Sequence, residues 1–340
     1  MDSITHLFYG GVIAAAIAPR GHRRAALLAG MALNTLPDLD VLPLSLCDDP
    51  VVRLTWHRAA THSWLVLPFV AWALWAWFKR RGGRVAAAPG RWFVVILVTL
   101  MSHPLLDAFT VYGTQLFWPL PMRPLMGSSL FIIDPLFLLP WLVAFIVAWF
   151  ARERIGRHAL ALGIALGVGY LGWSWIAKTL VDREADRALA AMGLADAPRF
   201  SVPMPLNTLL WRVVAMTPGG YVEGFRSVAA DTGPMTFRGY PTNVQALAEA
   251  RDIAAVRELA WFNHGFMRTQ VVDGELVLSD LRMGNEPDYF FSYAVARREG
   301  DGWQPLEPPR KLDPHRDFGP MWQATWHRIW HQPPAEAGLR

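Results

Sequence analysis

Histidine and aspartate residues recur near the ends of apolar segments in the first third of the chain. They are His6, Asp38, Asp40, His57, His62, His103 and Asp107. Imidazole nitrogens and carboxylate oxygens are ligands for zinc and related divalent ions. The single cysteine, Cys47, excludes an intrachain disulfide and any multi-cysteine zinc site. The residue types therefore predict a divalent metal, with zinc expected first, held by histidine and aspartate.

The firmest pair in this group is His103 and Asp107. Their spacing of four places both side chains on one face of a helix, where they can share one ion. The alternative is a structural hydrogen bond between the two. Asp38 and Asp40 follow Pro37, which should help to end the preceding helix. Their carboxylates either enter the same site or serve only capping and turn chemistry.

The remaining histidines depend on how the chain bends. His57 and His62 are five residues apart and cannot share one face of a straight helix, so we expect one ligand and one supporting residue. Thr61 and Ser63 can cap a helix that begins at Trp64. His6 joins the site only if an N-terminal hairpin returns it to the level of the two aspartates.

Arg58 and three of the aspartates, Asp38, Asp40 and Asp134, are the predicted catalytic residues. The planar guanidinium of Arg58 can bind two oxygens of an anionic group, or anchor a lipid headgroup instead. A divalent ion lowers the pKa of bound water to about 7 and polarises a phosphoryl or carbonyl oxygen. Asp38 or Asp40 would then serve as general base. Asp134 lies at the edge of an apolar segment, and we expect it to orient a ligand or Arg123.

The elements that carry these residues are apolar enough for a membrane. Hydrophobic residues make up 53% of the 340 residues and charged residues 18%, against about 25% in soluble domains. The predicted spans are 64–78, 92–106, 130–150 and a softer segment at 159–177. Segments 4–18 and 25–36 are shorter and predict a helical hairpin. A cleaved signal peptide is disfavoured because Met1-Asp2-Ser3 has no basic residue.

Charge asymmetry predicts the orientation. Loops 19–24, 79–91 and 152–157 contain eleven Lys and Arg residues, whereas 37–63 and 110–129 contain three. The positive-inside rule places the first set in the cytoplasm. The histidine and aspartate cluster and everything after residue 180 then face the periplasm or the cell exterior. Because the basic residues flank apolar segments, the net charge of +4 does not indicate nucleic-acid binding.

The chain changes character after residue 180. Residues 181–340 are more charged and predict a small soluble α+β domain, following a membrane domain at 1–180. Strands are expected at 209–214 and 221–225, a helix at 244–261, and strands at 270–283 and 288–297 with a turn at Asp273-Gly274. The fold class is an all-α transmembrane bundle of about four spans and a short hairpin, followed by this domain.

Three tryptophans near residue 326 form a stripe at helical spacing. Trp322, Trp326 and Trp330 recur every four residues on a short predicted helix. We expect core packing for this stripe, and contact with a bilayer surface as the alternative.

The combined motifs resemble the YdjM-like family of bacterial inner-membrane proteins, described as membrane-bound metal-dependent hydrolases. They are Thr5-His6, Leu36-Pro37-Asp38-Leu39-Asp40, His57-Arg58-x-x-Thr61-His62-Ser63, His103-x-Leu105-Leu106-Asp107 with Thr110-x-Tyr112-Gly113-Thr114, and Trp118-Pro119. The match covers about residues 1–150. The family is distantly similar to zinc-dependent phospholipase C, whose His-x-x-x-Asp pair is matched by His103 and Asp107. The chain lacks the later His-x-x-x-Glu pair of those enzymes.

The resemblance and the cluster predict a membrane-bound hydrolase. Its substrate would be a lipid or another small phosphoester that reaches the site among lipid headgroups. The first alternative is a non-enzymatic envelope or stress-response protein with a structural metal. The second is a transporter, which is disfavoured because few polar residues lie deep in the predicted spans.

Overall fold

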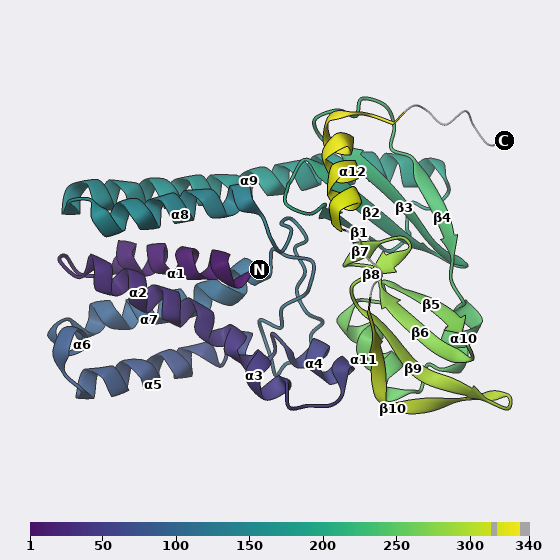
Figure 1. Cartoon of the computed structure of the whole chain (residues 1–340), viewed down its shortest axis with the longest axis horizontal. Helices are drawn as coiled ribbons and strands as arrows, with labels where there is room; N and C mark the ends of the chain where they lie inside the picture. Colours follow the sequence, from purple (N-terminus) through teal and green to yellow (C-terminus); the bar gives the residue numbers. More distant parts are fainter. Residues whose placement is uncertain (314–317, 334–340) are drawn as a thin grey trace. The chain divides into compact units, whose positions relative to one another are not determined.

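The fold was analysed in a computed structural model that describes residues 1–313 and 318–333 (Figure 1). Internal contacts divide the chain into two compact units. The first comprises Met1–Cys47, Arg53–Gly127 and Ile132–Trp173, and the second comprises Asp48–Val52, Ser128–Phe131 and the chain from Ser174 onward. The division near residue 173 falls inside one long helix, α9 (Glu153–Ala191).

The first unit is helical. Its elements are α1 (Ser3–Ile17), α2 (Arg23–Thr35), the 3₁₀ helix η1 (Leu36–Asp40), α3 (Val41–Leu44), α4 (Pro50–Trp56), the 3₁₀ helix η2 (Ala60–His62), α5 (Leu67–Arg80), α6 (Gly83–Ala87), α7 (Pro89–Asp107), α8 (Pro135–Phe150) and the first part of α9. In the described residues, three helical stretches are long and apolar enough to cross a membrane: Arg23–Leu44, Pro89–Asp107 and Glu153–Ala191. A fourth is possible if Pro50–His62 and Leu67–Arg80, bent by 58°, form one broken span.

Two predicted spans need correction. The segment 130–150 is helical only over Pro135–Phe150, which is 16 residues long and below the length expected of a full span. Conversely, the second arm of the N-terminal hairpin is longer than predicted. The α-helix α2 does end just before Pro37, at Thr35, but the chain continues through η1 and α3, so the apolar helical stretch runs to Leu44. The helix predicted at Trp64 begins at Leu67 instead.

A close crossing of α1 and α2 forms the centre of the helical unit. Gly10 and Gly30 lie where the two helices meet, and a Cβ at Gly10 would overlap the side chain of Asn34. A Cβ at Gly30 would overlap the backbone of Gly10. Small residues at such crossings let helix backbones approach closely. The crossing brings His6 on α1 beside Asn34 on α2, and α1 also packs against α7 and α8.

The second unit is built on two antiparallel four-stranded sheets. The first has the order β1-β2-β3-β4, formed by Arg199–Pro203, Leu210–Thr217, Gly220–Ser227 and Phe237–Pro241. The second has the order β10-β9-β6-β5, formed by Gly302–Leu312, Ser292–Glu299, Glu275–Asp280 and Met267–Val272. A two-stranded ribbon pairs β7 (Gly284–Asn285) with β8 (Asp288–Tyr289).

Local sequence signals explain parts of this unit. Asp273 and Gly274 both have positive φ, as a two-residue hairpin turn requires, and they join β5 to β6. The helix predicted at 244–261 is two helices, α10 (Val244–Glu249) and α11 (Ala254–Phe262). The strands β1, β4 and β10 were not among the predicted elements.

The helix α12 (Phe318–Trp330) corrects the expectation for the tryptophan stripe. Trp322, Trp326 and Trp330 are 40%, 51% and 50% exposed, so the stripe does not pack into a core. Among residues 322–330 of α12, whose side chains the structure describes, the buried positions are Thr325 and Ile329. Ile329 packs with Met204 and Leu210.

Candidate metal centre

Four side chains in the helical unit converge on one point. They are Asp38 on η1, His62 on η2, and His103 and Asp107 on α7. One ligand atom from each lies within 4.8 Å of the others. The side chains of His62, His103 and Asp107 are fully buried, and that of Asp38 is 15% exposed. Residues far apart in the sequence therefore form one compact polar cluster in a largely apolar unit.

The ligand atoms of the cluster lie close enough together to share one ion. The Nε2 atoms of His62 and His103 are 3.0 Å apart. Asp38 Oδ1 lies 3.4 and 3.3 Å from these two nitrogens, and Asp107 Oδ2 lies 3.3 Å from each. Zinc bonds of about 2.0–2.1 Å imply ligand–ligand separations of about 3.3–3.4 Å at tetrahedral angles. Five of the six separations are therefore close to those around a four-coordinate ion, and all six lie within 4.8 Å.

Hydrogen bonding around the cluster supports the same interpretation. His103 Nδ1 donates to the backbone oxygen of Asn34 at 2.5 Å. His62 Nδ1 donates to Thr61 Oγ1 at 3.0 Å. Each bond fixes the proton on Nδ1 and leaves the Nε2 lone pair directed at the cluster centre. Asp38 Oδ1 and Asp107 Oδ2 are buried and accept no hydrogen bond. Four acceptors facing one another, without donors, are stabilised by a cation.

His6 lies behind this group. Its Nδ1 is 3.1 Å from Asn34 Oδ1, and its Nε2 is 3.3 Å from Asp107 Oδ1. Its ring stacks on that of His103 with centroids 3.8 Å apart. His6 is therefore placed to support Asp107 and His103, and it is not one of the four converging residues.

Asp40 and His57 contact each other beside His62, outside the four converging residues. His57 Nδ1 lies 2.8 Å from Asp40 Oδ1, and Asp40 Oδ2 accepts from the Thr61 hydroxyl at 2.8 Å and from the backbone amide of Arg58 at 3.2 Å. Of the predicted ligands, Asp40 and His57 thus bind each other. The side chain of His57 is 19% exposed, and its ring lies 5.7 Å from that of His62.

Arg58 points into the protein. Its Nη2 lies 3.1 Å from Asp107 Oδ1, its Nη1 donates to Thr110 Oγ1 at 3.3 Å, and its guanidinium lies over the Tyr112 ring. The residue is 4% exposed and has a φ of 67°, a conformation that is uncommon outside glycine. Its charge therefore balances Asp107, and the terminal amine of Met1 contacts the same carboxylate oxygen.

Asp134 has a different role from the one predicted. Its Oδ1 accepts from the backbone amides of Leu136 and Phe137, each at 3.0 Å, and so caps α8. Its Oδ2 accepts from the hydroxyl of Tyr170 at 2.9 Å. Both oxygens are used away from the metal ligands and Arg123, so we correct the expectation that Asp134 orients either of them.

Asn34 is the supporting residue that sequence analysis missed. It is fully buried, its carboxamide nitrogen donates to Thr99 O at 2.6 Å, and it contacts both His6 and His103. A polar residue inside the apolar run at 25–36 was the available signal. The prediction overlooked it because an amide does not suggest metal binding by type.

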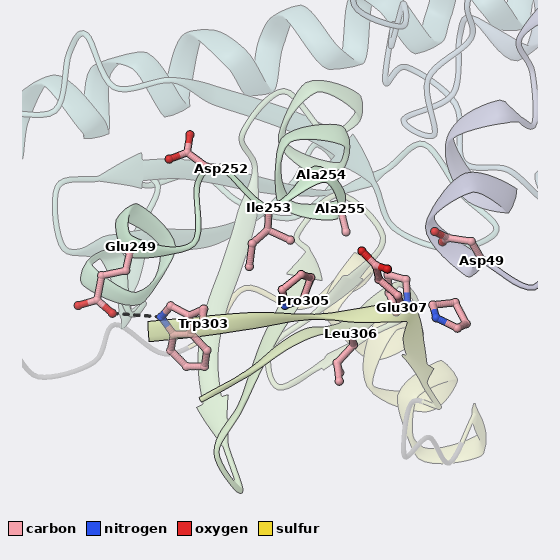
Figure 2. A pocket seen from close by; sticks show the side chains of 12 residues that line it. Asp49, Glu249, Asp252, Ile253, Ala254, Ala255, Trp303, Pro305, Leu306 and Glu307 are labelled. Atoms are coloured by element: carbon pink, nitrogen blue, oxygen red, sulfur yellow. Dashed lines mark hydrogen bonds between the residues drawn. The ribbon is translucent and has the colours of Figure 1, made fainter. Parts of the chain in front are cut away.

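A separate cavity of about 600 Å³ lies on the second unit, between β10 and the start of α11 (Figure 2). Glu249 and Asp252 lie on one side of it, and Trp303 donates to Glu249 at 3.1 Å. None of the four cluster residues lines this cavity, and none of its lining residues is a histidine. Among the described residues, the cluster is the group of histidine and aspartate side chains that could hold a metal ion.

The fold and the cluster together define a membrane protein with several apolar helices and a buried histidine–aspartate site. The family model described as "YdjM inner membrane protein" matches residues 1–181. The chain belongs to this family. A similar curated protein is "Inner membrane protein YbcI" of Escherichia coli (strain K12), which is 32% identical over 155 residues, 46% of this chain and 79% of that protein. No solved structure matched the chain.

Proposed function

We propose that this protein is a membrane-bound, metal-dependent hydrolase. The observation that carries the proposal is the convergence of four ligand atoms with two buried carboxylate oxygens that accept no hydrogen bond. Asp38, His62, His103 and Asp107 would hold one divalent ion, and a set of two imidazole nitrogens and two carboxylate oxygens favours zinc. When bound, such an ion supplies Lewis-acid activation of water and of a phosphoryl or carbonyl oxygen.

The chain's own groups have distinct parts in this proposal. Arg58 offsets the negative charge of Asp107 and so lets two carboxylates share a buried site. Asp40 holds His57 at the more exposed side of the cluster, where an arriving substrate would meet its ring. Thr61 links Asp40 to His62 and holds that ligand's orientation.

The proposed substrate is a phosphoester or a lipid headgroup. A site carried on membrane-crossing helices is reached most directly by molecules of the bilayer and its surface. The charge asymmetry of the loops supports an extracytoplasmic position for the site and for the domain after residue 180.

A structural metal site is the second candidate, and one observation favours it. Four protein ligands complete a tetrahedral shell, whereas catalytic zinc sites usually keep one position for water or substrate. Under this alternative the protein would bind metal tightly and hydrolyse nothing.

Two measurements on the purified full chain separate these candidates. Elemental analysis should find a divalent metal in the wild type and lose it in His103→Ala. Replacing the metal with cobalt then shows whether its coordination shell is open. Azide or thiocyanate shifts the visible spectrum of bound cobalt only where an exchangeable coordination position exists. A spectral shift, with metal-dependent hydrolysis of a phosphoester panel, supports the hydrolase. A bound metal without either result would support the structural role, and no bound metal would refute both.

A further inference from the structure

The tryptophan face of α12 is built to point away from the protein. Trp322, Trp326 and Trp330 form a continuous ladder, with successive ring centroids 5.9 and 5.8 Å apart. Each ring is at least 40% exposed. Large exposed apolar surfaces on a folded protein usually mark a binding surface.

The opposite face of α12 fixes the helix in this orientation. Ile329 is 1% exposed and packs with Met204 and Leu210, and its carbonyl accepts from Ser227 Oγ at 2.6 Å. Arg328 forms an ion pair with Asp231 at 2.5 Å. Rotating the helix to bury the tryptophans would break these contacts. The exposed ladder is therefore a defined feature of the folded unit.

The position of α12 along its own sheet indicates what covers the ladder. Along α9, Ala177 packs with Trp211, near the start of β2, whereas Leu189 packs with Ala215, near its end. Leu210 and Ile329 share a cluster, so α12 lies at the end of the sheet where α9 arrives. The opposite end of the sheet lies beside the end of α9.

The part of α9 that packs against this end of the sheet follows directly after the apolar stretch of the helix. The stretch begins near Ala159, after the basic residues of loop 152–157, and runs for about 20 residues to near Ala177. Trp173 and Trp175, which are 36% and 44% exposed, lie near its end. Tryptophan concentrates at membrane interfaces, where its ring is apolar and its N–H remains hydrated. The sheet end that carries α12 thus follows the interfacial part of α9 within a few residues.

We propose that the Trp322–Trp326–Trp330 ladder inserts into the headgroup region of the same bilayer that the chain spans. The ladder would act as a second attachment of the sheet unit, beside its covalent attachment through α9. Indole rings provide the apolar area, and the exposed His327 and His331 beside them can contact lipid phosphates. This proposal does not depend on metal binding or hydrolysis.

Site-directed spin labelling of the full chain tests it. Cys47 is the only cysteine, so a Cys47→Ser background accepts a single nitroxide label through Trp326→Cys. The matched control is Met192→Cys, because Met192 is 48% exposed and follows α9 at the opposite end of the same sheet. Both proteins are placed in vesicles of phosphatidylethanolamine and phosphatidylglycerol. Collision rates with oxygen, which partitions into lipid, and with a nickel chelate, which does not, are then compared.

We expect a higher ratio of oxygen to nickel collisions at position 326 than at position 192. Equal ratios would overturn the proposal. Exclusion of both reagents at position 326, with dipolar broadening between labels, would also overturn it and would indicate that a second copy of the chain covers the ladder. Trp322→Cys repeats the measurement, and circular dichroism shows whether each labelled variant retains its fold.

Discussion

Asp107 in the helical unit and Asp280 in the sheet unit are both buried carboxylates, but they are neutralised differently. Both oxygens of Asp280 accept from the guanidinium of Arg282, at 2.7–3.1 Å, and Arg282 also donates to Phe262 O. Arg58 forms an ion pair with Oδ1 of Asp107. The other oxygen, Oδ2, accepts no hydrogen bond from the described residues and faces two imidazole nitrogens. Both oxygens of Asp280 are hydrogen-bonded within the protein, whereas Asp107 keeps one oxygen that is suited to binding a cation.

The two carboxylates differ in how completely their charge is hydrogen-bonded within the protein. Burying an ion pair is costly, and full hydrogen bonding reduces the cost. The sheet unit meets this condition with residues two positions apart. In the helical unit, two carboxylate oxygens that accept no hydrogen bond from the described residues face the Nε2 atoms of two imidazoles, and a bound cation would stabilise this arrangement.

The largest expected effect comes from removing a ligand. His103→Ala should reduce metal affinity by more than the ~10–100-fold that a supporting residue contributes, because a quarter of the shell is lost. Metal content per chain after dialysis against a weak chelator measures this. His158→Ala, at an exposed histidine on α9, is the matched control and should retain the metal. Equal metal content in both variants would place the ion elsewhere.

The next effect concerns stability in the other unit. Asp280→Asn removes one charge of the Asp280–Arg282 pair and leaves Arg282 buried without its counter-ion, which should cost about 3–5 kcal/mol. Thermal unfolding in detergent should show the loss, while metal content stays unchanged. If Asp280→Asn instead released the metal, the distinction between the two carboxylates would fail.

A smaller effect is expected at the supporting layer. Thr61→Val keeps the shape of the side chain but removes the hydroxyl that contacts both Asp40 and His62. Metal affinity should fall by roughly 10–100-fold, because the orientation of His62 is less constrained. Competition with a chelator of known affinity gives the value. Thr179→Val, at an exposed hydroxyl on α9, should leave the affinity unchanged.

The smallest effect is an alkaline loss of stability in the sheet unit. Burial, and then the nearby Tyr289 and Glu286, raise the pKa of the Tyr221 phenol, and burial also raises that of Tyr289. A phenol whose pKa is higher in the folded than in the unfolded state stabilises the fold. This stabilisation is fully present below the ordinary tyrosine pKa of about 10 and is lost as pH rises through the folded-state pKa. Unfolding followed from pH 9 upward should show this decline.

Tyr221→Phe reports on the same decline. The variant should lose stability less steeply with rising pH, because it has one phenol fewer to ionise. Parallel curves for the variant and the wild type would show that Tyr221 does not contribute to the alkaline transition.

Much of the site was predictable because its signals are local. The His103–Asp107 spacing defines one helix face, and the motif around Asp38 and His62 supplied the other two converging residues. Which of the two aspartates joins the cluster, and which one binds His57, was not predictable. Asp38 and Asp40 are two residues apart, yet the 3₁₀ turn of η1 directs one to the cluster and the other to His57. Sequence spacing cannot distinguish them, because both lie in the same short turn.

The sequence by itself determined the membrane character, the family, the absence of cysteine ligands and the residue types available for a metal. These depend on composition and local pattern. Tertiary structure alone decided which four side chains converge, that Arg58 pairs with Asp107, that Tyr170 donates to Asp134, and that the tryptophan ladder is exposed. Each of these depends on contacts between segments far apart in the chain, such as the close crossing of α1 and α2, which no local pattern specifies.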